Sequence, residues 1–394
     1  MPRILRIINR FNLGGPTYNA AYLTKYLPPE YETMLLGGMK DETEDSSQFI
    51  VENLGITPTV LHEMHREINI FNDAAAYRKI KKIIAEFKPD IVHTHASKPG
   101  ALGRWAAHQM NVPVIIHTFH GHVFHSYFNP AKTKFYKSLE RKLAKVSTRI
   151  IAISEKQKEE LSIEHEICPA EKIEVIPLGF DLNRFQNGIA KKREVFREEF
   201  SLAEDDIAVS IVGRLVPIKN HKLYLDSMKW VKERINRRLK GFIVGDGESR
   251  AHLESYCTEI GLTYSSDSED DVDIYFTSWV KNVDFVNSGS DIIALTSKNE
   301  GTPVSLIEAQ AGNRAIVSTR VGGIEDVVIP DETALLSDPN NTEAFQQNLL
   351  KLASDDDLRR ELGERGWSFV KDKFHYERLA RDVAALYERL LVDF

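Results

Sequence analysis

The chain has 394 residues, of which 42% are hydrophobic and 28% charged, which suits a globular protein long enough for two domains. Its net charge of −7 argues against a general nucleic-acid-binding protein. No apolar run reaches membrane-spanning length, and Cys168 and Cys257 form neither a disulfide framework nor a metal-binding spacing, so we expect a cytoplasmic protein.

The first half of the chain alternates apolar runs with helical patterns. Its opening run leads into a turn at Gly14 and Gly15 and then into a helix. The strands that we predict here are 4–8, 33–36, 58–61, 91–94, 114–118, 150–153 and 173–176. Helical patterns such as 74–87 lie between several of them, which predicts a parallel sheet with helices on both faces. The glycine pair lacks the G-x-G-x-x-G spacing of a dinucleotide-binding turn.

Histidines gather where two of these strands end. Ligands of parallel sheets bind beyond the carboxyl ends of the strands, where His95 and His120 lie. A metal site is disfavoured, because carboxylate or cysteine ligands are missing nearby. We expect His120 to face a cleft and to contact a substrate hydroxyl or phosphate. His93 and His117 lie inside the strands and are expected to be hydrogen-bonded core residues.

A basic helix is predicted at 131–149. Its cations, against Glu140 alone, are Lys132, Lys134, Lys137, Arg141, Lys142, Lys145 and Arg149. Such a helix either rests on an anionic membrane surface or is the exposed basic face of a soluble enzyme. Arg66, Lys98 and Arg104 are expected to add positive charge beside the same cleft.

The strand–helix pattern restarts after a polar linker and helix at 181–199. The strands that we predict in this half are 207–212, 242–244, 274–277, 292–295 and 316–319. Arg214 and Lys219 occupy the loop after the first of these strands, where two cations can neutralise a diphosphate. Gly245 lies in a tight turn after the second. A final amphipathic helix begins near residue 376.

The stretch 297–310 carries two carboxylates on either side of a helix start. A strand precedes it, Gly301 and Pro303 form a turn, and a helix then opens. Glu300 lies before the free amides of that helix, and Glu308 lies more than a turn inside it. A phosphate at the helix start would therefore be flanked by carboxylates that accept from hydroxyls. The alternative is a pair of solvated glutamates at a helix end.

Together these motifs resemble the family 4 retaining glycosyltransferases, which have the GT-B architecture, over nearly the whole chain. The motifs of the second half are E-G-T-P-V-S-L-I-E-A at 300–309 with its E-x7-E spacing, G-R-L-x3-K at 213–219, G-D-G at 245–247 and V-G-G at 321–323. Those of the first half are Gly14-Gly15, P-D-I-V-H-T-H at 89–95 and H-T-F-H-G-H at 117–122.

The resemblance implies an α/β fold of two Rossmann-like parallel-sheet domains that face a central cleft. Residues 1–180 would form the acceptor-side domain, and residues 181–375 the domain that binds the nucleotide-sugar donor. Residues 376–394 would form a helix that packs back on the first domain.

The resemblance also implies roles for individual residues. His120 and Glu300 would contact the donor sugar, and Arg214 and Lys219 would bind its diphosphate as the remaining catalytic residues. The other donor-binding positions would be Gly15, Gly245, Val280, Gly301, Thr302, Pro303, Val304, Ser305 and Glu308. Among these, Glu308 would accept from the ribose hydroxyls. On the acceptor side the candidates are His95, Lys98 and Arg66.

The implied activity is retaining, metal-independent transfer of a sugar from a nucleotide-diphosphate sugar, with UDP as the leading nucleotide. The acceptor would be a sugar or a lipid-linked glycan in cell-envelope or surface polysaccharide or glycolipid biosynthesis, at the inner face of the membrane through residues 131–149. The alternatives are a GT-B nucleotide-sugar epimerase, which needs no acceptor, and a non-catalytic nucleotide-sugar-binding subunit. An NAD dehydrogenase is disfavoured because the dinucleotide fingerprint is missing.

Overall fold

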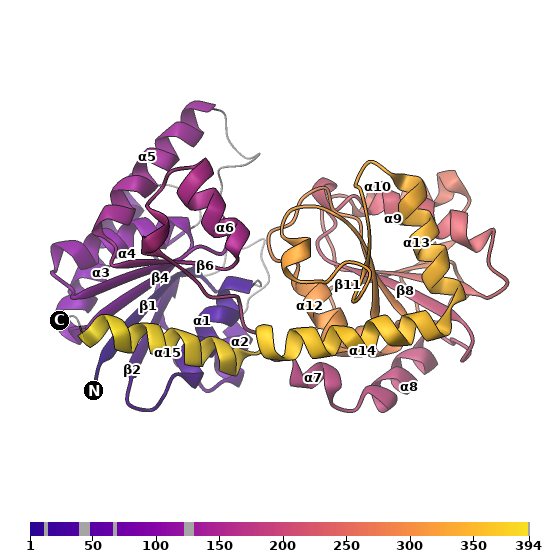
Figure 1. The fold of residues 1–394 in the computed structure, drawn as a ribbon, viewed down its shortest axis with the longest axis horizontal. Helices are drawn as coiled ribbons and strands as arrows, with labels where there is room; N and C mark the ends of the chain where they lie inside the picture. The colour runs from indigo at the N-terminus through magenta and orange to yellow at the C-terminus, as the bar shows by residue number, and fades with distance from the viewer. Residues whose placement is uncertain (12–14, 39–47, 66–68, 122–129, 393–394) are drawn as a thin grey trace. The chain divides into compact units, whose positions relative to one another are not determined.

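The computed structural model describes residues 1–11, 15–38, 48–65, 69–121 and 130–392. They divide into two compact units, Met1–Phe180 with Phe374–Phe394, and Asp181–Lys373 (Figure 1). Each unit is a parallel β-sheet with helices packed against it. This confirms the predicted α/β fold with two parallel-sheet domains.

The first unit contains, within its described residues, a seven-stranded sheet in the order β3-β2-β1-β4-β5-β6-β7. The strands are β1 Arg3–Arg10, β2 Glu32–Gly38, β3 Thr59–Leu61, β4 Ile91–His95, β5 Val114–Thr118, β6 Arg149–Ala152 and β7 Ile173–Val175. All neighbouring pairs are parallel. Every residue of β4 and β5 is buried, because helices cover both faces of a parallel sheet. These strands therefore appear in the sequence as continuous apolar runs, with their histidines and threonines inside the core.

Helix α15 returns from the far end of the chain to the first unit. The described helices of this unit are α1 Gly15–Tyr26, α2 Gln48–Asn53, α3 Ile70–Phe87, α4 Ser97–Gln109, α5 Pro130–Val146, α6 Glu155–Glu159 and α15 Tyr376–Val392. Leu379, Val383 and Tyr387 of α15 share a buried cluster with Ile4 of β1 and Leu23 of α1. Burying several such side chains stabilises the unit by about 1.5–3 kcal/mol each, so α15 is part of its core.

The second unit repeats the architecture, with a described sheet in the order β10-β11-β9-β8-β12-β13-β14. The strands are β8 Ile207–Val212, β9 Leu239–Val244, β10 Tyr264–Ser265, β11 Ile274–Ser278, β12 Ile292–Leu295, β13 Ala315–Thr319 and β14 Leu335–Ser337. The helices are α7 Asn183–Gln186, α8 Ile189–Glu199, α9 His221–Lys232, α10 Arg250–Ile260, α11 Val283–Gly289, α12 Val304–Ala311, α13 Thr342–Ser354 and α14 Asp356–Lys373. The edge strands β10 and β14 were not expected from the sequence, because runs this short carry no periodic signal.

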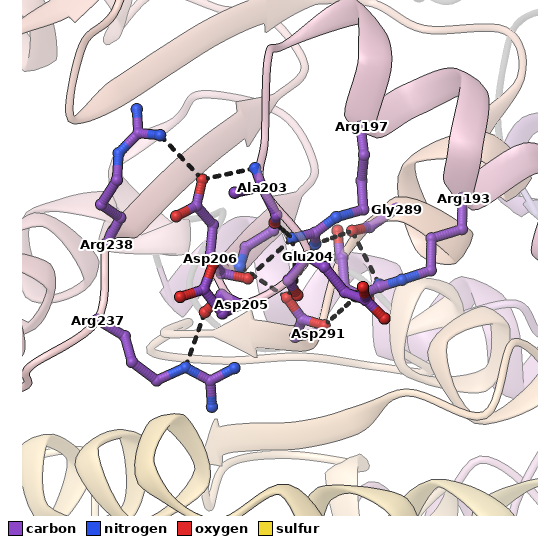
Figure 2. Close-up of polar contacts among 12 residues, drawn as sticks. Arg193, Arg197, Ala203, Glu204, Asp205, Asp206, Arg237, Arg238, Gly289 and Asp291 are labelled. Carbon is purple, nitrogen blue, oxygen red and sulfur yellow. Dashed lines mark hydrogen bonds and ion pairs between the residues drawn. The ribbon is translucent and has the colours of Figure 1, made fainter.

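An ion-pair cluster ties α8 to the amino ends of the central strands (Figure 2). Asp291, which precedes β12, lies 2.8 Å from the Nη2 of Arg193 and 3.4 Å from the Nη1 of Arg197, both on α8. Its Oδ2 also accepts from the backbone amide of Ala208 in β8 at 2.8 Å. One carboxylate thus joins a helix to two strands, at the edge of the sheet opposite the predicted site.

Candidate functional site

The loops that follow β8, β9, β12 and β13 interlock at the carboxyl edge of the second sheet. A Cβ added at Gly245 would lie 2.0 Å from the carbonyl oxygen of Gly213, and one at Gly322 would lie 1.9 Å from that of Glu300. Such approaches are possible only for glycine. The glycine turns therefore pack the loop that carries the predicted cations, and the loop that carries Glu300, against their neighbours.

Lys219 and Glu300 meet directly. The Nζ of Lys219 lies 2.6 Å from the Oε1 of Glu300, and their side chains are 23% and 11% exposed. The hydroxyl of Ser297 donates to the same oxygen at 2.5 Å. The carbonyl of Lys219 accepts from the hydroxyl of Thr296 at 3.0 Å, which joins the two loops. Two of the predicted catalytic residues are thus held together with fixed geometry.

Arg214 is exposed in the same loop as Lys219. Within the described part of the chain, its guanidinium makes no hydrogen bond or ion pair. A guanidinium of this kind presents five N–H donors that match phosphate oxygens. Arg214 is therefore ready to bind an anion without first leaving another partner.

The start of α12 lies just beyond Glu300 in the chain. Gly301 is exposed, Thr302 is half-buried, and Pro303 forms the N-cap. Among the described residues, no side chain caps the first turn that begins at Val304 and Ser305. Uncapped amides at a helix start favour an anion through both hydrogen bonding and the helix dipole.

Glu308 lies further along α12, in a largely buried position with 18% of its side chain exposed. The pKa of its carboxyl is raised to about 7, chiefly by burial, while the charge of Arg184 lowers it and that of Asp284 raises it. The Nη2 of Arg184 lies 3.8 Å from the Oε1 of Glu308. The carboxyl therefore titrates near neutral pH, and hydroxyl donors that favour the charged form would shift it toward the carboxylate.

The segment around Val280 is joined to the glycine turn after β9. The amide of Gly245 donates to the carbonyl of Ser278 at 2.9 Å. Val280 is half-buried and packs against the aromatic cluster of Phe196, Phe200 and neighbouring apolar residues. Of the predicted donor-binding residues, those on the second unit thus lie on the loops that follow its strands or on α12, which one of these loops leads into.

In the first unit, His95 and His120 contact each other. The Nδ1 of His95 and the Nε2 of His120 lie 2.8 Å apart. His93 and His117 are buried and hydrogen-bonded, to Tyr387 and Thr118 in the first case and to Thr94 in the second, which confirms the core interpretation. Burial lowers the pKa of the His120 imidazole to about 4, and the pKa values of the other three imidazoles also lie well below the ordinary value of 6.5, chiefly because of burial. At neutral pH all four rings are neutral.

The other first-unit candidates have different surroundings. Lys98 forms an ion pair with Asp73, and its Nζ donates to the carbonyl of His65 at 2.9 Å. Gly15 is the first residue of α1. Arg66 lies outside the described residues.

Helix α5 has an exposed face without an acidic residue. Its Glu140 is buried and pairs with Arg104 of α4 at 2.7 Å. The exposed residues include Lys132, Lys134, Phe135, Lys142 and Lys145. The helix ends earlier than expected, at Val146, because Arg149 already begins β6. In the described ranges, no helix combines the length and the apolar character needed to cross a membrane.

Sequence reasoning missed two residues that touch the predicted carboxylates. Ser297 lies three residues before Glu300 in the same loop, so the sequence already indicated that the two side chains could meet. Arg184 reaches Glu308 from α7, which is far away in the chain. A contact of that kind depends on the tertiary fold and has no local signature.

Family models match nearly the whole chain in two parts. "Glycosyltransferase Family 4" matches residues 13–184, and "Glycosyl transferases group 1" matches residues 192–368. The UDP-Gal:alpha-D-GlcNAc-diphosphoundecaprenol alpha-1,3-galactosyltransferase of Escherichia coli is 31% identical over 294 residues, which are 74% of this chain and 73% of that protein. The capsular polysaccharide biosynthesis glycosyltransferase CapM of Staphylococcus aureus is 26% identical over 344 residues, 84% of each chain.

Solved structures share the same fold. A glycosyltransferase from Rickettsia africae superposes with a TM-score of 0.79 at 20% identity and covers 99% of this chain and 98% of its own. HepE of Anabaena, in complex with UDP, gives a TM-score of 0.79 at 16% identity and covers 98% and 100%. These similarities support the GT-B fold, whereas the family models and the sequence relatives identify the family. The chain belongs to glycosyltransferase family 4 and is a glycosyltransferase.

Proposed function

We propose that this enzyme transfers a sugar, with retention of anomeric configuration and without a metal ion, from a UDP-sugar to a lipid-linked glycan acceptor in surface polysaccharide or glycolipid biosynthesis. The observation that carries this proposal is the Lys219–Glu300 contact of 2.6 Å beside the uncapped start of α12. The nucleotide and the type of acceptor follow the names of the similar proteins, which include a UDP complex and a galactosyltransferase acting on a diphosphoundecaprenol-linked sugar.

The cations Lys219 and Arg214 are proposed to stabilise the leaving diphosphate. When the bond between the sugar and the diphosphate breaks, negative charge builds up on the departing oxygen. Lys219 uses one ammonium donor for Glu300, which leaves two for the phosphates, and Arg214 is exposed beside it in the loop. Lys219 and the amides of α12 are held in place before the reaction, and Arg214 has no partner to leave among the described residues. Each such contact is expected to contribute on the order of 2–4 kcal/mol to the transition state. In this scheme they supply the charge compensation that a metal ion supplies in other transferases.

Glu300 is proposed to bind the sugar. Its Oε1 is occupied by Lys219 and Ser297. Its other oxygen makes no hydrogen bond with the described residues and is proposed to accept from a sugar hydroxyl. We assign no covalent nucleophile, and the acceptor is proposed to attack on the face from which the diphosphate leaves.

The test of this proposal is a screen of the purified protein against a panel of UDP-sugars with a lipid-linked acceptor. We expect transfer from one or more donors, an α-linked product from an α-linked donor by NMR, and unchanged activity in EDTA. Lys219→Ala and Arg214→Ala should each lower kcat/KM by about 30-fold to 1000-fold. Transfer at the native rate by both variants would rule out the assignment of these residues.

We also propose that α5 rests on the anionic surface of a membrane. The support is its exposed lysines, its exposed Phe135, 64% accessible, and the removal of Glu140 into the core. The protein should co-sediment with vesicles that contain phosphatidylglycerol at low salt and be released at high salt, since surface attraction is screened. The double reversal Lys142→Glu with Lys145→Glu should abolish binding, whereas Lys229→Glu, at an exposed lysine of α9 in the second unit, should not. Absence of binding at low salt would remove the membrane contact.

A further inference from the structure

A buried stack of imidazoles lies at the carboxyl ends of β4 and β5. The rings of His93 and His95 stack with centroids 4.4 Å apart, and those of His95 and His120 with centroids 5.1 Å apart. His95 is fully buried. It therefore does not reach solvent, and its only hydrogen bond to another described side chain is the one to His120.

The far side of the stack is firmly anchored. The Nη2 of Arg6 donates to the hydroxyl of Tyr387 at 3.0 Å, and that hydroxyl lies 2.6 Å from the Nδ1 of His93. Since an arginine cannot accept, the tyrosine donates to His93, and the Nε2–H of His93 donates to Thr118 at 2.7 Å. His93 thus has one defined tautomer and presents a fixed ring face to His95.

The near side has unused hydrogen-bonding capacity. The Nε2 of His95 and the Nδ1 of His120 are both buried, and neither has a hydrogen-bond partner among the residues that the structure describes. A buried polar atom without a partner costs about 1–3 kcal/mol, and such atoms in native proteins call for an explanation. A bound hydroxyl beside His120 would supply the missing partner.

The two rings share one proton position. A neutral imidazole has one donor and one acceptor. When the Nε2–H of His120 donates to His95, the Nδ1 of His120 carries a lone pair. When the Nδ1–H of His95 donates instead, the Nδ1 of His120 carries the proton. The state of His95 therefore determines whether His120 offers an acceptor or a donor.

We propose that His95 is a positioning residue for His120, holding its ring plane and setting its tautomer so that the Nδ1 of His120 makes one defined hydrogen bond to a hydroxyl of the transferred sugar. This assignment rests on the proposed function. His95 was expected from the sequence to contact the acceptor. The positioning role replaces that expectation, because the His95 ring is covered by protein on all sides. The contact to His120 accounts for a polar ring at a position where the core would otherwise take an apolar side chain.

Two substitutions of His95 separate positioning from packing. The amide of His95→Asn reaches the position of the Nδ1 and can still bond to His120, whereas the amide of His95→Gln reaches the position of the Nε2 and cannot. We expect His95→Asn to keep kcat within about threefold, and His95→Gln to lose about tenfold to 100-fold in kcat, the value of one or two hydrogen bonds. The affinity for UDP alone should be unchanged in both. Equal losses in the two variants, or a native rate in His95→Gln, would overturn the assignment.

A second measurement does not depend on activity. The ring nitrogens of His120 in the 15N-histidine-labelled wild-type protein should show a single neutral tautomer, and this signature should persist in His95→Asn. A mixture of tautomers in the wild-type protein would contradict the proposal. If the wild-type protein transfers no sugar from any donor but shows the single tautomer, the proposed function fails while the positioning of His120 by His95 stands.

Discussion

At the scale of single residues, burial determines what each charged group can do. Lys219 and Glu300 form a partly buried ion pair, with 23% and 11% of their side chains exposed. Glu308 has only the more distant Arg184, and burial raises its pKa to about 7. Glu308 should therefore make the reaction sensitive to pH near neutrality.

Binding of a UDP-sugar should strengthen as the pH rises from 6 to 8. Ribose hydroxyls are proposed to donate to the Glu308 carboxylate. With a pKa of about 7, this group is mostly protonated at pH 6 and mostly charged at pH 8. The dissociation constant should therefore fall by up to about tenfold over this range. A UDP-sugar is the suitable ligand, since its diphosphate does not titrate there. Calorimetry on Glu308→Gln should give weaker binding with no such trend, and an equal trend in this variant would refute the role of Glu308.

The residues of the site divide by how far their partners lie along the chain. Arg214, Lys219, Glu300 and Glu308 were recognisable because each lies at a fixed spacing after a strand end. The contact of Arg184 with Glu308 and the pairing of His95 with His120 depend on which strands and helices become neighbours. No local sequence pattern predicts such contacts, so only the structure shows these two.

At the scale of elements, glycine turns determine whether the strand-end loops pack. Gly322 has a φ of +55°, and an added Cβ would lie 1.9 Å from the carbonyl oxygen of Glu300. Gly188 has a φ of +69° but open space around it. An alanine at either position would therefore adopt the same left-handed backbone, but only the one at position 322 would clash with a neighbouring atom.

Gly322→Ala should inactivate the enzyme far more than Gly188→Ala does. Both variants should lose about 1–2 kcal/mol of stability from the left-handed backbone, but only the first displaces the loop of Glu300. We expect a loss in kcat/KM of at least about tenfold for Gly322→Ala and nearly native kinetics for Gly188→Ala. Native kinetics in both would show that the loop contact does not position Glu300.

The ion-pair cluster of α8 should carry more stability than surface pairs do. Replacing Asp291 by Ala leaves Arg193 and Arg197 without their shared carboxylate in a largely buried setting, which should cost about 3–5 kcal/mol in the free energy of unfolding. Asp357, paired with Arg360 at 2.6 Å but highly exposed, is the control, and Asp357→Ala should cost less than about 1 kcal/mol. Urea denaturation measures both values, and similar values for the two would contradict this reasoning.

At the scale of the whole molecule, the fold was largely predictable because parallel strands are buried on both faces. Continuous apolar runs such as 114–118 and 292–295 identified the strands, and the alternation with helices identified the sheet type. The short strands β10 and β14 were not predicted, because two or three residues are too few to show a hydrophobic period. The ion-pair cluster at Asp291 escaped because its members come from separate elements.

The proposed function depends most on how the second unit binds a diphosphate, and UDP affinity tests this directly. Lys219→Ala should bind UDP about tenfold to 100-fold more weakly than the wild type, the value of a charge-assisted contact. Glu300→Gln frees Lys219 from its countercharge, so it should bind UDP at least as tightly as the wild type while losing sugar transfer.

Isothermal titration of UDP into the three proteins at pH 8 is therefore the decisive measurement. The predicted result is weak binding by Lys219→Ala and undiminished binding by Glu300→Gln. Equal affinity of Lys219→Ala and the wild type, or loss of UDP binding in a folded Glu300→Gln, would contradict the proposal that Lys219 holds the diphosphate while Glu300 holds the sugar.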